Sequence, residues 1–270
     1  MNFFERLLII LDAKMPVPTL FGWFHILCLI LTALVTFFLI KKYKDSNDKV
    51  FRKIILITWL IIVVLEVYKQ LNFSFNVDDL TWNYNWFYFP YQFCSTPLYV
   101  LPFIIFCKEG KFRDAFLAYT ITYAFFGGLA VMIYPGDVYI ETIGINIQTM
   151  VHHGSQVVLG IFVAVHERKK FGKKFFMLAI PVFVVAVLIA LAFNVIGHFV
   201  IPDEGLNMFY VGPYKNCTLP LLNVIYPLVP WPVFFILYVG GFTLILVLIA
   251  LVAMLIKNKF PFKNHAKEDS

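Results

Sequence analysis

The chain has 270 residues, of which 61% are hydrophobic, 19% aromatic and only 14% charged. A mean hydropathy of +0.81 excludes a water-soluble globular domain of this length and indicates a protein that crosses a membrane several times. The net charge of +6 matters only through the position of the lysines and arginines, and nothing in the sequence favours nucleic acid as a partner.

Residues 1–18 predict a short N-terminal helix that lies in the membrane interface. Their apolar run at 7–11 is too short, and too crowded by charged residues, for a cleaved signal peptide. Pro16 and Pro18 would turn the chain into the membrane. Helical spacing relates the apolar residues Phe3, Phe4, Leu7, Leu8 and Leu11.

Seven apolar stretches that follow are long enough to cross a bilayer as helices. They are residues 19–40, 54–71, 91–107, 115–134, 144–166, 175–201 and 231–256. The sequence therefore predicts an all-α fold in which residues 19–256 form one domain, a bundle of seven transmembrane helices.

Basic residues gather in alternate connections between these stretches. Most lysines and arginines lie in the segments 41–53, 108–113, 168–174 and 257–267, whereas the other connections are mainly acidic. The positive-inside rule then places the C-terminus, with a basic tail at 257–270, in the cytoplasm and the N-terminus outside.

Polar side chains within the predicted helices concentrate toward the outer ends. A charged side chain in hydrocarbon costs on the order of 2.5–3.5 kcal/mol, so a cluster drawn from five helices predicts one shared polar cavity that opens toward the outer leaflet. Its expected members are His25, Glu66, Lys69, Gln92, Cys94, Gln148, His152, His153, Gln156, Asn194 and His198.

Cys94 is the candidate nucleophile of this cluster. Pro90 suits the first position of a helix, which would place Cys94 close to the helix start, where the helix dipole favours the thiolate. A thiol beside an imidazole base is an arrangement used in acyl transfer, and the ester available within a membrane is that of a lipid. His152 and His153 lie about 100° apart around one helix, and periodicity does not choose between them.

The same residues are also compatible with roles other than nucleophilic catalysis. Glu66 and Lys69 are three residues apart and can pair with each other, and His25 and His198 can serve as hydrogen-bond partners between helices. Three histidines around zinc would make a metal-dependent lipid hydrolase, although no fixed ligand spacing is present and no cofactor is indicated. A non-enzymatic carrier of lipids or small molecules would use the cavity only for binding.

Several short motifs follow one another from His25 to Ile256. They are His25, Glu66, Phe89-Pro90-Tyr91-Gln92-Phe93-Cys94, Phe126-Gly127-Gly128, Pro135, His153-Gly154, Asn194, Gly205-Leu206-Asn207-Met208 and Pro230-Trp231-Pro232. In this order and spacing the chain resembles the YwaF-type integral membrane proteins, bacterial relatives of transmembrane protein 164.

The resemblance implies a membrane acyltransferase that moves a fatty acyl chain between phospholipids, so that its partners are a phospholipid and a lysophospholipid. It makes Cys94 the nucleophile and His153 the general base. The chain departs from the bacterial pattern at Gln92, where a histidine is usual, and at Met208, where a tyrosine is usual. The supporting residues would be His152, Gln92, Glu66, His25, Asn194, His198 and Asn207.

Overall fold

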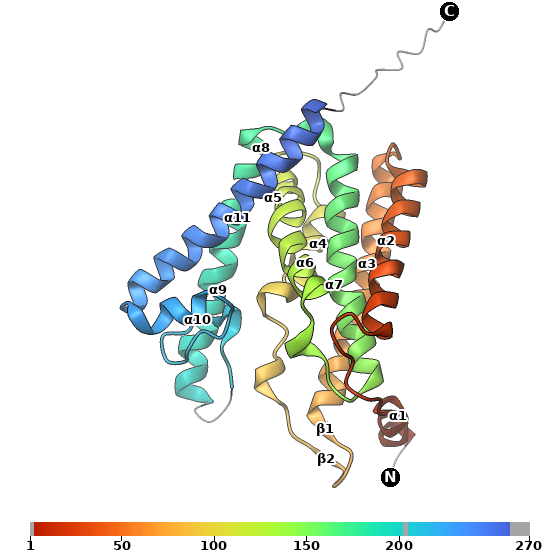
Figure 1. Cartoon of the computed structure of the whole chain (residues 1–270), viewed down its shortest axis with the longest axis vertical. Helices are drawn as coiled ribbons and strands as arrows, with labels where there is room; N and C mark the ends of the chain where they lie inside the picture. The colour runs from red at the N-terminus through yellow and green to blue at the C-terminus, as the bar shows by residue number, and fades with distance from the viewer. Residues whose placement is uncertain (1–2, 202–204, 260–270) are drawn as a thin grey trace, which may run out of the picture.

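The computed structural model describes residues 3–201 and 205–259 as a helical bundle with one short β-hairpin (Figure 1). The predicted tail at 257–270 lies mostly outside these residues. The elements are α1 (Phe3–Leu11), α2 (Trp23–Tyr43), α3 (Asp48–Ser74), β1 (Phe75–Asn76), β2 (Thr81–Trp82), α4 (Pro97–Phe106), α5 (Lys111–Tyr119), α6 (Phe125–Ile133), α7 (Ile143–His166), α8 (Lys173–Met177), α9 (Ala179–Val200), α10 (Leu222–Ile225) and α11 (Trp231–Lys259).

Four helical stretches of the described residues are long and apolar enough to cross a membrane. They are Trp23–Tyr43, Lys111–Ile133, Lys173–Val200 and Trp231–Lys259. The prediction of an all-α membrane protein is therefore confirmed. The remaining predicted stretches contain α3 and α7, which carry several polar side chains, and α4, which has 10 residues, so the number of seven spans stays a prediction.

The third predicted helix does not begin at Pro90, and this part of the prediction is wrong. Residues Phe93–Ser95 form a 3-10 turn, η2, and α4 starts only at Pro97. Proline has no N–H, so Pro97 cannot donate the α-helical hydrogen bond to the carbonyl of Phe93. That carbonyl instead accepts from the backbone N–H and the hydroxyl of Thr96. Cys94 consequently lies in a tight turn ahead of α4.

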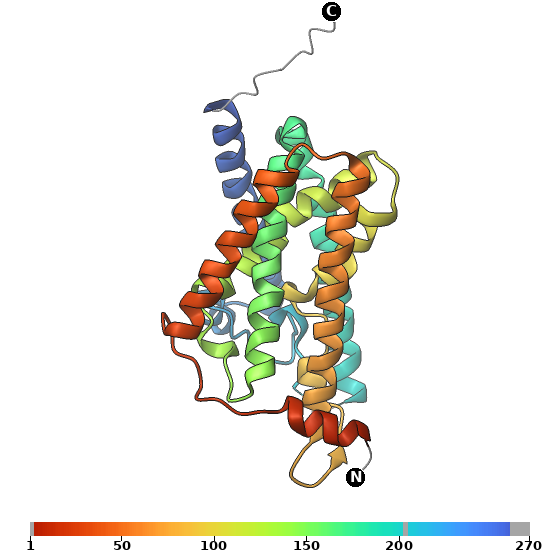
Figure 2. The ribbon, with the colours of Figure 1, turned by 90° about the vertical axis from the view of Figure 1, so that its right-hand side faces the viewer.

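Helix α7 lies at the centre of the bundle, with α2 and α3 beside it (Figure 2) and α6 packed against it. Gly128 in α6 permits this close packing. A Cβ atom at Gly128 would lie 2.5 Å from Cβ of Gln156 and 2.6 Å from the carbonyl oxygen of His153. A glycine is therefore needed where α6 crosses the histidine-bearing turn of α7.

One end of the molecule carries α1 and the hairpin, in which Phe75 pairs with Trp82 in antiparallel register. The segment after α1 is tied to the start of α7 by an isolated bridge between Lys14 and Thr142. The Tyr68 hydroxyl of α3 donates to the carbonyl of Leu11. These contacts hold α1 across the end of α3.

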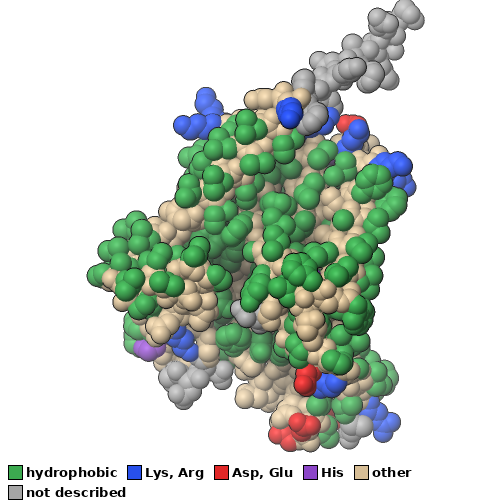
Figure 3. Space-filling view, viewed as in Figure 1, with side chains coloured by type: hydrophobic (Ala, Val, Ile, Leu, Met, Phe, Trp, Pro, Cys, Tyr) green, Lys and Arg blue, Asp and Glu red, His purple; other side chains and the backbone are tan. Residues whose placement is uncertain are grey.

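The opposite end is held by partly buried ion pairs, and Figure 3 shows Lys and Arg side chains around it. Arg113 of α5 is only 1% exposed, and its guanidinium donates to Asp48 of α3 at 2.6 Å and to the carbonyl of Ile104 at 3.0 Å. Arg52 donates to the same carboxylate at 2.6 Å. The shared carboxylate therefore joins α3 to α5, and the bond from Arg113 to the Ile104 carbonyl adds α4 to the network.

Glu167, which follows α7 at this end, predicts a pH-dependent contribution to stability. Burial raises the pKa of Glu167, but hydrogen bonds from His166 and Lys170 outweigh it and hold the pKa below the usual 4.5. A carboxylate with a lowered pKa stabilises the fold above its unfolded pKa and loses that contribution as pH falls through its folded pKa. We expect Glu167→Gln to lower the melting temperature by about 3–6 °C at pH 7 and by progressively less below about pH 4.5.

Melting curves of both proteins between pH 3.5 and 7.5 measure this difference. Glu109→Gln is the matched control at the same end, because its side chain is 71% exposed and should leave the curve unchanged. A deficit of Glu167→Gln that stays constant across this range contradicts a role for the charge.

Candidate active site

The turn that carries Cys94 is held by two side chains of α7. Nε2 of His152 lies 2.9 Å from the Cys94 carbonyl oxygen, and the amide of Gln156 donates to the same oxygen at 3.0 Å. A carbonyl only accepts, so Nε2 of His152 carries the proton and Nδ1 bears the lone pair in the neutral ring. This Nδ1 is buried and has no hydrogen-bond partner among the described residues.

His153 presents a second free imidazole nitrogen. Its Nδ1 donates to the carbonyl of Thr149 at 2.7 Å, one turn earlier in α7, which leaves the lone pair on Nε2. The residue is 6% exposed, and within the described part of the chain Nε2 has no partner. The rings of His152 and His153 are 5.3 Å apart between centroids. Both histidines therefore offer a free lone pair, through different ring nitrogens.

A buried ion pair of α3 completes this group. Glu66 is 5% exposed, and its Oε1 accepts from Lys69 at 2.8 Å and from Gln70 at 2.7 Å. Its Oε2 is buried and finds no donor in the described residues. The charges of Glu66 and Lys69 both act on the Cys94 thiol and on His153. We refer to Glu66, Cys94, His152, His153 and Gln156 together as the Cys94 site.

The predicted supporting amides Gln92 and Asn194 hold the loop that follows α9. Gln92 donates to the carbonyl of Asn207 at 3.2 Å and accepts from the backbone N–H of Phe209 at 2.9 Å. Asn194 bonds both backbone groups of Met208. These amides bond the backbone of a loop whose Phe209 packs on Phe93 of η2, so Gln92 ties the Cys94 turn to that loop.

The side chain of Asn207 stabilises the same loop from within. Its Oδ1 accepts from the backbone N–H of Gly212 at 3.0 Å, and its amide group donates to the carbonyl of Asn216 at 3.2 Å. The structure thus places Asn207 next to Gln92 through its backbone, with its side chain directed into the loop.

His25 lies apart from the Cys94 site. Nδ1 of His25 accepts from the backbone N–H of Phe21 at 3.0 Å, so Nε2 carries the proton and donates to the carbonyl of Met132 at 2.8 Å. Both ring nitrogens are used, and the side chain is fully buried. His25 thus links α2 to the end of α6, which matches a role in bonding between helices.

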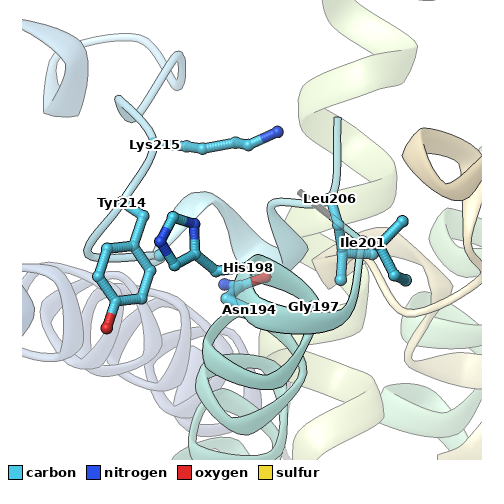
Figure 4. Close-up of a pocket in the computed structure, with 8 residues that line it drawn as sticks. Asn194, Gly197, His198, Ile201, Leu206, Tyr214 and Lys215 are labelled. Carbon is cyan, nitrogen blue, oxygen red and sulfur yellow. The ribbon is translucent and has the colours of Figure 1, made fainter. Parts of the chain in front are cut away.

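His198 also lies elsewhere, at the end of α9, where it is exposed. Its ring stacks on Tyr214 at 3.9 Å, and Figure 4 shows both rings beside the extended side chain of Lys215. The residues expected to share one cavity therefore fall into separate groups. The pocket at His198 is lined by Asn194, Gly197, His198, Ile201, Leu206, Gly212, Tyr214 and Lys215.

Tyr119 is a residue near the site that the sequence did not single out. It ends α5 just before the π-helical turn η3 (Thr120–Ala124), is fully buried, and donates its hydroxyl to Thr96 at 3.0 Å. Thr96 in turn donates to the carbonyl of Phe93 at 2.9 Å. Tyr119 therefore braces the turn that carries Cys94, and its apolar sequence surroundings contain no signal of this role.

Within the described residues, no group of three or more His, Cys, Asp or Glu side chains is arranged to hold a metal ion.

Comparison with known proteins gives the same family as the order of the sequence motifs. No curated protein and no solved structure matches the chain. The family model described as the TMEM164 family matches residues 20–255, which include every residue of the Cys94 site. The chain therefore belongs to the TMEM164 family.

Proposed function

We propose that this protein is a membrane lipid acyltransferase in which Cys94 accepts the acyl chain and His153 moves the proton. The proposal depends mainly on one observation: Nε2 of His153 is buried and has no hydrogen-bond partner among the described residues, and the same helix holds the Cys94 turn. A general base needs a free lone pair within reach of the group that it deprotonates. His153 has a free lone pair on Nε2, because its other ring nitrogen donates to the carbonyl of Thr149.

The proposed reaction has two balanced steps. Nε2 of His153 takes the thiol proton, the Cys94 thiolate attacks the ester carbonyl of a phospholipid, and the C–O bond breaks as the leaving lysolipid oxygen takes the proton back. In the second step His153 removes a proton from the hydroxyl of an acceptor lysophospholipid. That oxygen attacks the thioester, the C–S bond breaks, and the thiol is reprotonated.

The buried acceptors of the Cys94 site support a hydroxyl-bearing substrate. Nδ1 of His152, Oε1 of Gln156 and Oε2 of Glu66 are all buried and lack a donor among the residues described. Buried polar atoms are almost always hydrogen-bonded, so these atoms require a ligand or water that donates. Lysolipid hydroxyl groups have this chemistry, whereas an ester oxygen does not.

The distribution of charge supports the proposed orientation. Basic side chains surround the end where α3 begins and α7 and α11 end, so the positive-inside rule places that end in the cytoplasm. Seven spans, with the N-terminus outside, fit this arrangement. The Cys94 site, contributed by η2 and the outer parts of α3 and α7, would then serve the outer leaflet.

Trapping the acyl-enzyme tests the proposal. Purified protein is incubated with a phospholipid that carries a labelled acyl chain, and the label bound to protein is measured before and after neutral hydroxylamine, which cleaves thioesters. We expect hydroxylamine-labile label on the wild type, none on Cys94→Ala, and wild-type labelling of the control Cys107→Ala. Equal labelling of Cys94→Ala removes the nucleophile, and lipid-dependent stabilisation without any labelling favours a lipid carrier.

A further inference from the structure

A second polar feature lies at the base of the hairpin, where α3 ends (Figure 1). It is a cavity of about 310 Å³ that is open at the surface, where Asn76 and Asn83 are exposed. Its described lining contains three amides, two hydroxyl groups and two phenylalanine rings, and no charged side chain. The lining residues are Phe73, Ser74, Phe75, Asn76, Asn83, Tyr84 and Asn85.

The amides of this cavity have hydrogen-bonding capacity to spare. Oδ1 of Asn76 accepts from the backbone N–H of Asp78, and Oδ1 of Asn85 accepts from that of Phe87. Their NH₂ groups, and the whole side chain of Asn83, have no hydrogen-bond partner within the described part of the chain. The cavity thus offers several amide donors together with the acceptor oxygen of Asn83.

The aromatic part of the lining is rigid. Phe73 stacks on Tyr88 with ring centroids 3.6 Å apart, and Phe75 packs on Trp82 across the hairpin at 4.9 Å. Such pairs hold their rings in defined positions. Because Phe75 is only 5% exposed, Phe73 and Tyr84 supply the accessible aromatic surface of the cavity, beside the free amide groups.

From this combination we propose that the cavity binds an uncharged, hydroxyl-rich lipid headgroup, such as a sugar or glycerol. Hydroxyl groups donate and accept, as amides do, and the C–H faces of a sugar fit against aromatic rings. An anionic headgroup would require a cation, and the described lining residues include none.

The position of the cavity relative to the Cys94 site would add a glycolipid to the lipids that the proposed acyl transfer uses, and this step rests on that proposed function. The Tyr84 hydroxyl donates to Oε1 of Gln70 at 2.9 Å, and Gln70 donates to Glu66 at 2.7 Å. Glu66 and Ser74 are eight residues apart on α3, which corresponds to about 12 Å along the helix axis. A lipid headgroup in the cavity would thereby place its ester region at the level of Glu66.

Binding is tested with protein purified in an amine oxide detergent, because a sugar detergent would compete for the cavity. Monoglucosyldiacylglycerol and phosphatidic acid with the same acyl chains are titrated separately, and tryptophan fluorescence is recorded. We expect the glucolipid to bind at least about tenfold more tightly than phosphatidic acid. Asn83→Ala should weaken glucolipid binding about fivefold, which corresponds to the loss of one neutral hydrogen bond.

Matched variants make this result specific. Asn223→Ala removes an exposed amide from α10 and should bind as the wild type does. Asn83→Asp keeps the side-chain volume but removes the donor, and should lose as much affinity as Asn83→Ala. Wild-type affinity in both Asn83 variants, or equal binding of phosphatidic acid and glucolipid, overturns the headgroup site.

The binding experiment distinguishes failure of the headgroup site from failure of the proposed acyl transfer. Cys94→Ala should bind the glucolipid with wild-type affinity, since Cys94 does not line the cavity. Glucolipid binding without any thioester leaves the headgroup site intact and removes the acyltransferase. A thioester without preferential binding of the glucolipid supports the acyltransferase and removes the headgroup site.

Discussion

Replacing His153 with asparagine is expected to slow acyl transfer by about 10²–10⁴-fold while leaving the protein folded. The asparagine amide can occupy the place of Nδ1 and donate to the carbonyl of Thr149, as His153 does at 2.7 Å. It supplies nothing in place of the free Nε2, so only the proposed base is removed. Transfer of a labelled acyl chain from phospholipid to lysophospholipid, together with the melting temperature, measures both effects.

The neighbouring histidine provides the matched control. Glutamine at His152 can place an amide donor where Nε2 lies, 2.9 Å from the Cys94 carbonyl, and should retain activity within about tenfold. Alanine at His152 removes that donor and should lose more. If His152→Gln is inactive while His153→Asn remains active, then His152 is the base and the assignment to His153 is wrong.

The second large effect is expected from Gly128→Ala. The added methyl group would lie 2.5 Å from Cβ of Gln156 and 2.6 Å from the carbonyl oxygen of His153, so α6 and α7 must separate. Overpacking of this kind costs about 1–3 kcal/mol. Because the displaced turn of α7 bonds the Cys94 carbonyl through Gln156, we expect both a lower melting temperature and a loss of acyl transfer.

Gly240→Ala is the corresponding control in α11. Nothing lies within 4 Å of a Cβ atom at Gly240 among the described residues, and alanine is about 1 kcal/mol better than glycine within a helix, so stability should be equal or slightly higher. Melting temperatures and acyl-transfer rates of the two variants are compared in the same detergent. A Gly128→Ala protein with wild-type values would show that α6 and α7 need not approach so closely.

Sequence patterns predicted the helices well where a long apolar stretch alone defines the helix. The stretches that became α2 and α11 are long and apolar, and their structures match the prediction closely. The stretch from 91 to 107 failed because a proline inside it decides the local hydrogen bonding. Pro97 is visible in the sequence, but Pro90 offered an equally good helix start, and only the packing of η2 between α7 and the loop after α9 distinguishes them.

For the candidate site, the sequence predicted a contact within one helix better than it predicted contacts between helices. The pairing of Glu66 with Lys69 follows from their spacing in α3 and is observed at 2.8 Å. His25 and His198 have the same chemistry as His153 but bond or stack elsewhere. Sequence spacing could not separate these histidines, because their partners come from other helices and loops.

Hydropathy and charge along the chain are enough to identify a helical membrane protein with polar residues toward one end, since both are local properties of each segment. Which imidazole nitrogens are free, and what holds the Cys94 turn, follows only from the folded arrangement of the helices and loops. Those properties depend on carbonyls and amides brought together from α7, η2 and the loop after α9. A hydrogen bond between distant segments leaves no periodic trace in the sequence, and the chemistry proposed for this protein rests on such bonds.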